Sequence, residues 1–166
     1  MTLADDELLL RPPTAEDVPA LTEALQDPEI PRWTRVPSPY TDDDAWAWLA
    51  STGEERFLVV DRNSGELLGG VGLRAPEDGH AEIGYWVKRE ARGRGIAPRA
   101  VRLLSEWGLR ELGLARISLM TEPANTASQR VAEKAGYRRE GLLRSWMELK
   151  GERRDFVMFS LLPEDL

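Results

Sequence analysis

A short glycine-rich turn in the middle of the chain contains the residues best suited to do chemistry. Its sequence is Arg92-Gly93-Arg94-Gly95-Ile96-Ala97-Pro98. Glycines let a turn present its backbone N–H groups without side chains in the way. The first turn of a following helix adds unpaired N–H groups and the positive end of the helix dipole. Together with the two arginines, this pattern indicates a site for an anion, most naturally a pyrophosphate.

Spacing separates this turn from two common phosphate-binding turns. A mononucleotide P-loop requires Gly-x-x-x-x-Gly-Lys-Ser/Thr, whereas Ile96 and Ala97 follow the second glycine here. A dinucleotide-binding fold requires Gly-x-Gly-x-x-Gly after its first strand, whereas this turn lies mid-chain and has Pro98 at the third glycine position. The pattern that remains is Arg-x-x-Gly-x-Ala, placed between a strand and a helix.

Other blocks stand in order around the turn. Residues 11–17 contain Arg-Pro-x-x-x-x-Asp, residues 82–86 read Glu-Ile-Gly-Tyr-Trp, and residues 125–137 begin with Asn-x-x-Ser and end with Gly-Tyr. With the turn, these blocks resemble the GCN5-related N-acetyltransferases (the GNAT superfamily) and, within it, the ribosomal-protein N-terminal acetyltransferase branch (RimJ/RimL-like). The resemblance covers nearly the whole chain and implies one acetyltransferase domain over residues 1–166.

The resemblance implies an α/β (α+β) fold of the GNAT type. It predicts a mixed, largely antiparallel central sheet of about seven strands, with about four helices on both faces. The residues themselves indicate strands near 7–11, 56–61, 66–73, 80–88, 115–121, 137–149 and 154–162. Helices are expected after Thr14, after Thr41, after the glycine-rich turn and from Asn125. The prolines between residues 27 and 40 exclude a regular helix there.

Acetyl transfer from a thioester to an amine requires a bound CoA, a polarised carbonyl, a base for the ammonium and a proton for the leaving thiolate. The resemblance implies that the strand before the turn offers its backbone to the pantetheine arm, and that its edge splays from the next strand. Trp86 and Val87 then lie against the cofactor, and Asn125 hydrogen-bonds the arm. The residues expected to hold the pyrophosphate are Arg92, Gly93, Arg94, Gly95, Ile96 and Ala97.

Glu82 is the candidate general base. Strand alternation places it on one face with Gly84 and Trp86. A carboxylate on a central strand is costly unless it is solvated or paired, and a cleft is one place that tolerates it. The alternative is a structural partner for a nearby arginine. Glu140 and Glu148 are lesser candidates, and a water molecule can relay the proton.

Ser128 is the candidate proton donor to the thiolate. Many GNAT enzymes carry a tyrosine seven residues after the helix asparagine, but Ala132 occupies that position here. In the RimJ/RimL-like branch the serine three residues after the asparagine stands near the sulfur, which implies this role for Ser128. Without the resemblance, Asn125 is an ordinary N-cap and Ser128 an ordinary first-turn residue, and water protonates the thiolate.

The acceptor side is expected at the proline-rich loop, because loops on a scaffold often carry recognition. Trp33, Arg35 and Tyr40 are the candidate substrate-binding residues; the alternative is that Trp33 and Tyr40 tuck the loop onto the core. The branch resemblance favours direct attack by a protein or peptide N-terminal α-amine in a ternary complex. An amino acid, polyamine or aminoglycoside acceptor stays open, as do a non-catalytic acyl-CoA-binding module and a nucleotide-binding regulator.

The amino-acid composition argues against several other classes of protein function. Among 166 residues there is no cysteine and only one histidine, His80, so a thiol nucleophile and a cysteine zinc site are excluded and no metal is expected. The net charge of −7 argues against nucleic-acid binding. With no leader-like start and no long apolar span, we expect a cytoplasmic protein without membrane contact. Its expected partners are acetyl-CoA and an amine acceptor; a homodimer, frequent in similar proteins, has no interface readable from the sequence.

Overall fold

The computed structural model describes all 166 residues except for the side chains of Ala75 and Pro76. Its strands are β1 (Leu3–Ala4), β2 (Leu8–Arg11), β3 (Glu54–Asp61), β4 (Leu67–Glu77), β5 (His80–Val87), β6 (Arg116–Thr121), β7 (Arg138–Leu149) and β8 (Glu152–Leu161). Its α-helices are α1 (Val18–Ala24), α2 (Glu29–Trp33), α3 (Asp42–Ala50), α4 (Ile96–Arg110) and α5 (Thr126–Lys134). Among the described residues, no helix has both the length and the apolar character needed to cross a membrane.

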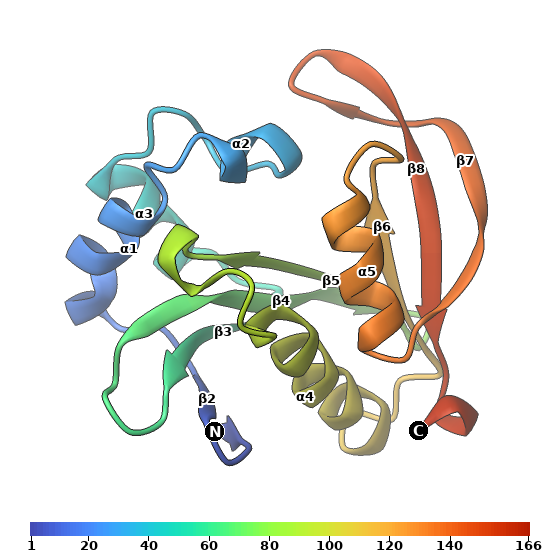
Figure 1. The fold of residues 1–166 in the computed structure, drawn as a ribbon, viewed down its shortest axis with the longest axis horizontal. Helices are drawn as coiled ribbons and strands as arrows, with labels where there is room; N and C mark the ends of the chain where they lie inside the picture. Colours follow the sequence, from blue (N-terminus) through green and yellow to red (C-terminus); the bar gives the residue numbers. More distant parts are fainter.

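The strands form one open mixed sheet in the order β1-β2-β3-β4-β5-β6-β8-β7 (Figure 1). All neighbouring strands are antiparallel except β5 and β6, which run parallel. A parallel pair needs a long crossover, and α4 provides it. The predicted mixed, largely antiparallel central sheet is therefore confirmed.

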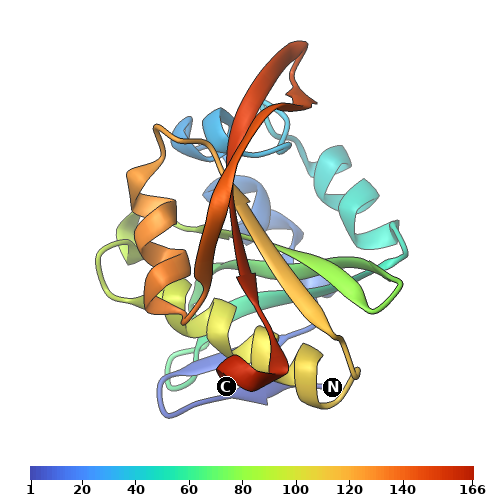
Figure 2. The ribbon, with the colours of Figure 1, turned by 90° about the vertical axis from the view of Figure 1, so that its right-hand side faces the viewer.

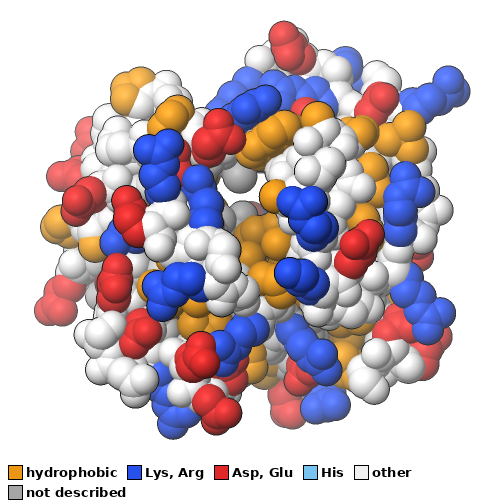
Figure 3. All heavy atoms as spheres, in the orientation of Figure 1, with side chains coloured by type: hydrophobic (Ala, Val, Ile, Leu, Met, Phe, Trp, Pro, Cys, Tyr) orange, Lys and Arg blue, Asp and Glu red, His pale blue; other side chains and the backbone are white. Residues whose placement is uncertain are grey.

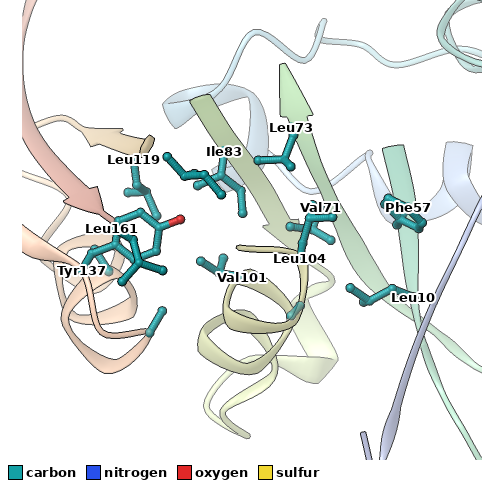
Figure 4. Close-up of a cluster of buried hydrophobic side chains, with 14 of the residues drawn as sticks. Leu10, Phe57, Val71, Leu73, Ile83, Val101, Leu104, Leu119, Tyr137 and Leu161 are labelled. Atoms are coloured by element: carbon teal, nitrogen blue, oxygen red, sulfur yellow. The ribbon is translucent and has the colours of Figure 1, made fainter. Parts of the chain in front are cut away.

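Both faces of the sheet are buried, and each has its own core. In β3, Phe57 and Val59 face the core under α4 and α5, whereas Leu58 and Val60 face the core under α1 and α3. This arrangement explains why β3 reads as a continuous apolar run and not as an alternating one. The helices lie on opposite sides of the sheet in the two perpendicular views (Figures 1 and 2). Figure 4 shows the first core, where α4 packs against the strands.

Two counts differ from the sequence prediction. The sheet has eight strands where about seven were expected, because the two-residue β1 is too short to show a period. There are five α-helices where about four were expected, because the proline-rich loop contains α2. The exclusion of helix between residues 27 and 40 was wrong for Glu29–Trp33.

The sequence of α2 explains why prolines did not prevent it. Pro28 is the N-cap and Pro31 lies within the first turn, where N–H groups have no intrahelical partner and a missing one costs nothing. Ile30 anchors the turn in the second core. The helix is also held from outside, since Lys150 in the β7–β8 turn donates to the carbonyl of Pro31 and, at 3.0 Å, to that of Val36.

The sheet opens between β5 and β6. The two strands pair only at His80↔Arg116, Ala81↔Ile117 and Glu82↔Ser118. Beyond that point β5 stays with β4 and β6 stays with β8, so the two strands diverge toward their carboxyl ends. Ligands of open α/β sheets bind at the carboxyl ends of parallel strands. The fold thus places an opening where the family resemblance implied a splayed edge.

Candidate active site

The glycine-rich turn has the conformation that its sequence predicts. Gly93 and Gly95 adopt φ of +75° and +74°, and Gly95 is the N-cap of α4. A Cβ added to either glycine would meet no protein atom within 4 Å, so the turn is open on its outer side. Within the described part of the chain, the N–H groups of these two glycines and of Arg94 donate to no backbone carbonyl. The residues therefore fit an anion such as a pyrophosphate.

The two arginines of the turn have different settings. Arg92 is tied to protein: its Nη2 lies 2.6 Å from the Asp27 carboxylate, and its Nε donates to the carbonyl of Val87 at 3.1 Å. Burial of the Asp27 carboxyl acts to raise its pKa, but the Glu29 N–H and the Arg92 charge hold that pKa below its usual range. Arg94 is exposed and does not line the cavity described below. Arg92 fixes the turn in place, which leaves the backbone as the anion-binding element.

A cavity of about 960 Å³ runs through the opening between β5 and β6. Its lining includes the turn at one end, the diverging strands in the middle and the α2 loop at the other end. Figure 3 shows a hollow between the two halves of the molecule, with hydrophobic side chains inside and Lys and Arg side chains around it. The volume lies within the range of a small-molecule or cofactor site.

Glu82 lies where β5 and β6 separate, and it lines the cavity. Its side chain is 24% exposed, and its Oε1 is 3.2 Å from Nη1 of Arg74 on β4. Arg74 in turn lies 3.9 Å from Glu54. The carboxylate is thus paired with an arginine, as one alternative expected, and it also lines the cavity, which is where a base would have to lie.

The sheet next to Glu82 has a floor without side chains. Across β4 and β5, Gly72 faces Gly84 and Gly70 faces Trp86. A Cβ on Gly84 would meet nothing within 4 Å, whereas one on Gly70 would come within 2.5 Å of the Trp86 indole. Bare backbone therefore lies between the Glu82 carboxylate and an indole that rests on β4, which leaves room for a small group beside the carboxylate.

Ser128 stands on the opposite face of β5 from Glu82. Its backbone N–H donates to Oδ1 of Asn125 at 3.2 Å, so Asn125 caps α5. Its Oγ accepts a hydrogen bond of 2.8 Å from the Tyr85 hydroxyl. Asn125, Ser128 and Tyr85 all line the cavity, as do Trp86 and Val87. The sequence analysis assigned no role to Tyr85, although strand alternation places it on the face opposite Glu82.

The predicted acceptor residues all line the cavity but differ in exposure. Arg35 is exposed and contacts the Met147 sulfur at 3.5 Å, while Trp33 is half-buried beneath the Arg32 guanidinium. Tyr40 is only 6% exposed and packs in the second core. Tyr40 therefore agrees with the alternative that it tucks the loop onto the core, and the loop folds back onto α1 and α3. Burial, together with the Asp44 charge, raises the pKa of Tyr40 to about 12.

The lesser carboxylate candidates lie away from the cavity lining. Glu140 pairs with Arg116 and accepts from Ser160 at 2.7 Å. These partners lower its pKa to about 2. Glu148 is exposed on β7. Neither residue belongs to the lining that holds Glu82.

Comparison with known proteins agrees with this geometry. A family model described as an acetyltransferase (GNAT) domain matches residues 7–138. The chain belongs to this family. N-acetyltransferase p20 of Bacillus licheniformis, itself uncharacterized, is 33% identical to this GNAT chain over 174 residues, covering 99% of the chain and 97% of p20.

Solved structures show the same fold over the full length of the GNAT chain. The GNAT-family acetyltransferase of Bacillus anthracis has a TM-score of 0.90 at 26% identity, with 99% of each chain covered. RimL, described as a ribosomal L7/L12 α-N-protein acetyltransferase in complex with coenzyme A, has a TM-score of 0.88 at 21% identity, with 100% of each chain covered. The predicted RimJ/RimL-like resemblance is confirmed at the level of structural neighbours.

Family membership identifies the kind of chemistry that the cavity serves. The protein is an acetyltransferase, and the GNAT fold uses acetyl-CoA. The residues that sequence reasoning missed are Arg74, Gly72 and Tyr85. No local sequence pattern identifies the first two, because it is the register of the β4–β5 hairpin that sets Arg74 opposite Glu82 and Gly72 opposite Gly84.

Proposed function

We propose that this chain, residues 1–166 acting as one catalytic domain, transfers the acetyl group of acetyl-CoA to the N-terminal α-amine of a protein or peptide. The observation that supports this most directly is the cavity that passes through the sheet between β5 and β6. Its lining presents a carboxylate from one face of β5 and a hydroxyl from the other. An amine and a thioester can therefore meet in the gap from opposite sides.

In this proposal the backbone N–H groups of residues 93–97 and the N-terminus of α4 bind the pyrophosphate of CoA. Asn125 and the exposed edge of β5 orient the pantetheine arm, beside Trp86 and Val87. Glu82 takes a proton from the acceptor ammonium, directly or through water, and so generates the neutral amine that attacks. Ser128 gives a proton to the leaving thiolate. Both groups act at the mouth of the gap, which fits direct attack in a ternary complex.

The acceptor end of the cavity supports a peptide N-terminus as the amine. The floor formed by Gly72 and Gly84 leaves room for a small group next to Glu82. Trp33 and Arg35 line the cavity farther out, under the contact between the α2 loop and the β7–β8 turn. An extended chain can enter along these residues with its first amine at the carboxylate. RimL, named as an α-N-protein acetyltransferase, is consistent with this choice.

The first test measures which nucleotide-like ligand stabilises the protein. Thermal unfolding is followed with acetyl-CoA, CoA, ATP and NAD, each in excess. A ligand at a hundred times its Kd adds about 2.7 kcal/mol to the free energy of unfolding, a shift of several degrees. We expect a shift with the two CoA species only. A shift with ATP or NAD alone would reject the assignment of the turn.

The second test identifies the acceptor. Release of free CoA thiol is followed with peptides of varied first residue, the same peptides blocked at the N-terminus, and a panel of amino acids, polyamines and aminoglycosides. We expect acetylation of free N-termini, located by mass spectrometry, and none of blocked peptides. Turnover of small amines with no turnover of peptides would replace the proposed acceptor while leaving the acetyltransferase intact.

A further inference from the structure

Tyr85 is a half-buried side chain whose hydroxyl the proposed chemistry has not yet used. It lies on β5 on the face opposite Glu82, and its ring packs against the first core. Its O–H donates to Ser128 Oγ at 2.8 Å, and both residues line the cavity. The phenol therefore connects β5 to the first turn of α5 at the place where the thiolate is expected to form.

The direction of this hydrogen bond determines where the Ser128 proton can point. Since Tyr85 donates to Ser128 Oγ, the hydrogen of the serine hydroxyl is free to be donated elsewhere. Among the described residues, Ser128 Oγ donates to no protein atom. The Asn125 cap fixes the serine backbone at 3.2 Å, so the remaining direction for the hydroxyl proton is toward the cavity.

We infer that Tyr85 is a positioning residue for the acid step: it orients the Ser128 hydroxyl toward the sulfur and replaces the proton that Ser128 gives up. This inference rests on the proposed function. In the step, the Oγ–H bond of Ser128 breaks as the S–H bond of CoA forms. The O–H bond of Tyr85 breaks as a new Oγ–H bond forms on Ser128, and the phenolate regains its proton from water.

The relay explains how a serine can serve as the acid. A serine hydroxyl is a much weaker acid than a thiol, so an isolated serine would be left as an unfavourable alkoxide. A tyrosine, with an ordinary pKa of about 10, lies far closer to a thiol at about 8.5. Burial raises the pKa of Tyr85, and the Ser128 hydrogen bond partly opposes this, so the phenol keeps its proton at neutral pH and is available as a donor.

The test compares binding of CoA with binding of desulfo-CoA, which lacks the sulfur, by calorimetry from about pH 6.5 to pH 9. A hydroxyl that donates to the thiolate lowers the pKa of the bound thiol, so the affinity ratio of CoA to desulfo-CoA rises with pH as that bound-state pKa is approached. We expect this rise in the wild type, none in Ser128→Ala, and a rise about fivefold smaller in Tyr85→Phe, from the loss of one neutral hydrogen bond.

Tyr137 supplies the matched control. It is a buried tyrosine whose hydroxyl also pairs with a helix serine, Ser105, at 2.6 Å, but neither residue lines the cavity. Tyr137→Phe is therefore expected to lower thermal stability while leaving the affinity ratio unchanged. In turnover, Tyr85→Phe should lower kcat about fivefold with an unchanged KM for acetyl-CoA, and should have no added effect when Ser128 is already alanine.

The outcomes separate the inference from the proposed function. A wild-type protein that binds neither ligand contradicts the proposed function. A wild type that binds both with a ratio independent of pH keeps the CoA site but overturns the acid role of Ser128 and Tyr85. A normal pH-dependent ratio in Tyr85→Phe overturns the role of the tyrosine alone. If Tyr85→Phe fails to fold, the Ser128→Ala comparison still tests the contact from the serine side.

Discussion

Gly95→Ala offers the sharpest separation between holding the fold and holding an anion. Gly95 has a φ of +74°, a conformation that costs an L-residue about 1–2 kcal/mol. A Cβ there would meet no protein atom within 4 Å, so no steric penalty is added and the free energy of unfolding should fall by about that amount. The same Cβ would enter the open side of the turn, where an anion has to approach the N–H groups.

The loss in affinity can be scaled from the hydrogen bonds at risk. One N–H bond to a charged group is worth about 1.5–3 kcal/mol, and 1.4 kcal/mol is tenfold in affinity. Gly95→Ala should therefore weaken CoA binding by about ten- to hundredfold per bond lost. Calorimetry measures the affinity, and denaturant unfolding without ligand measures the stability.

Gly113→Ala is the matched control at the far end of α4, about 22 Å away along a helix of 15 residues. Gly113 also has a positive φ, +67°, and a Cβ on it would also meet nothing within 4 Å. The two variants should lose similar stability, but only Gly95→Ala should lose CoA affinity. The reasoning fails if Gly95→Ala binds CoA within twofold of the wild type, or if Gly113→Ala weakens binding equally.

Three further changes test other parts of the site. Glu82→Gln should lower kcat/KM by a factor of about 10²–10⁴ near neutral pH while CoA affinity stays intact. The loss should shrink as the pH rises past the pKa of the acceptor amine, about 8, because the amine is then already neutral. Glu148→Gln, which lies outside the cavity, is the control in the same assay. Glu140→Gln should lower the free energy of unfolding by at most about 1 kcal/mol, because the ion pair with Arg116 is lost. Since folding lowers the pKa of Glu140 to about 2, the stability difference between wild type and variant is present above pH 4.5 and should vanish as the pH falls toward 2. Urea titrations at several pH values measure this difference. Lys150→Met should release the α2 loop, raising the acceptor KM while the Kd for CoA, measured separately, stays constant.

Much of the scaffold was predictable because its signals are local. Thr41 was predicted to begin a helix, and it is the N-cap of α3, where its side chain accepts a hydrogen bond from the Asp44 N–H at 3.3 Å. The two glycines of the turn at residues 93–95 indicate positive φ angles, and both glycines have them. By contrast, α2 depends on Lys150, more than a hundred residues away in the sequence. No local pattern reports a lysine of the β7–β8 turn that bonds a helix carbonyl and the carbonyl of Val36 just beyond the helix, so the local sequence pattern gave the wrong answer there.

The site was predictable residue by residue but not in its pairings. Glu82 was a candidate from strand alternation and Ser128 from the family resemblance, and the structure places both in the lining of one cavity. Their partners were hidden because Arg74 reaches Glu82 through the register of the β4–β5 hairpin, and Tyr85 reaches Ser128 across the packing of α5 on the sheet. Strand register and helix packing depend on tertiary structure, whereas a pattern in a single sequence predicts only which face of the sheet a side chain occupies.

The pairing between β5 and β6 is short, and its early end creates the opening that holds the candidate active site. If the β5–β6 hydrogen-bond ladder continued past Glu82, it would close the gap between the strands. The sheet would then separate Tyr85 and Ser128 from the Glu82 carboxylate on the other face. Ending it leaves backbone N–H and C=O groups of both strands facing the cavity, and such groups cost free energy unless something bonds them. A ligand with its own amides lowers that cost by completing the edge. The stability of the sheet is therefore coupled to occupancy of the gap, so CoA should protect the β5 amides from hydrogen exchange more strongly than those of β3, which is paired on both sides.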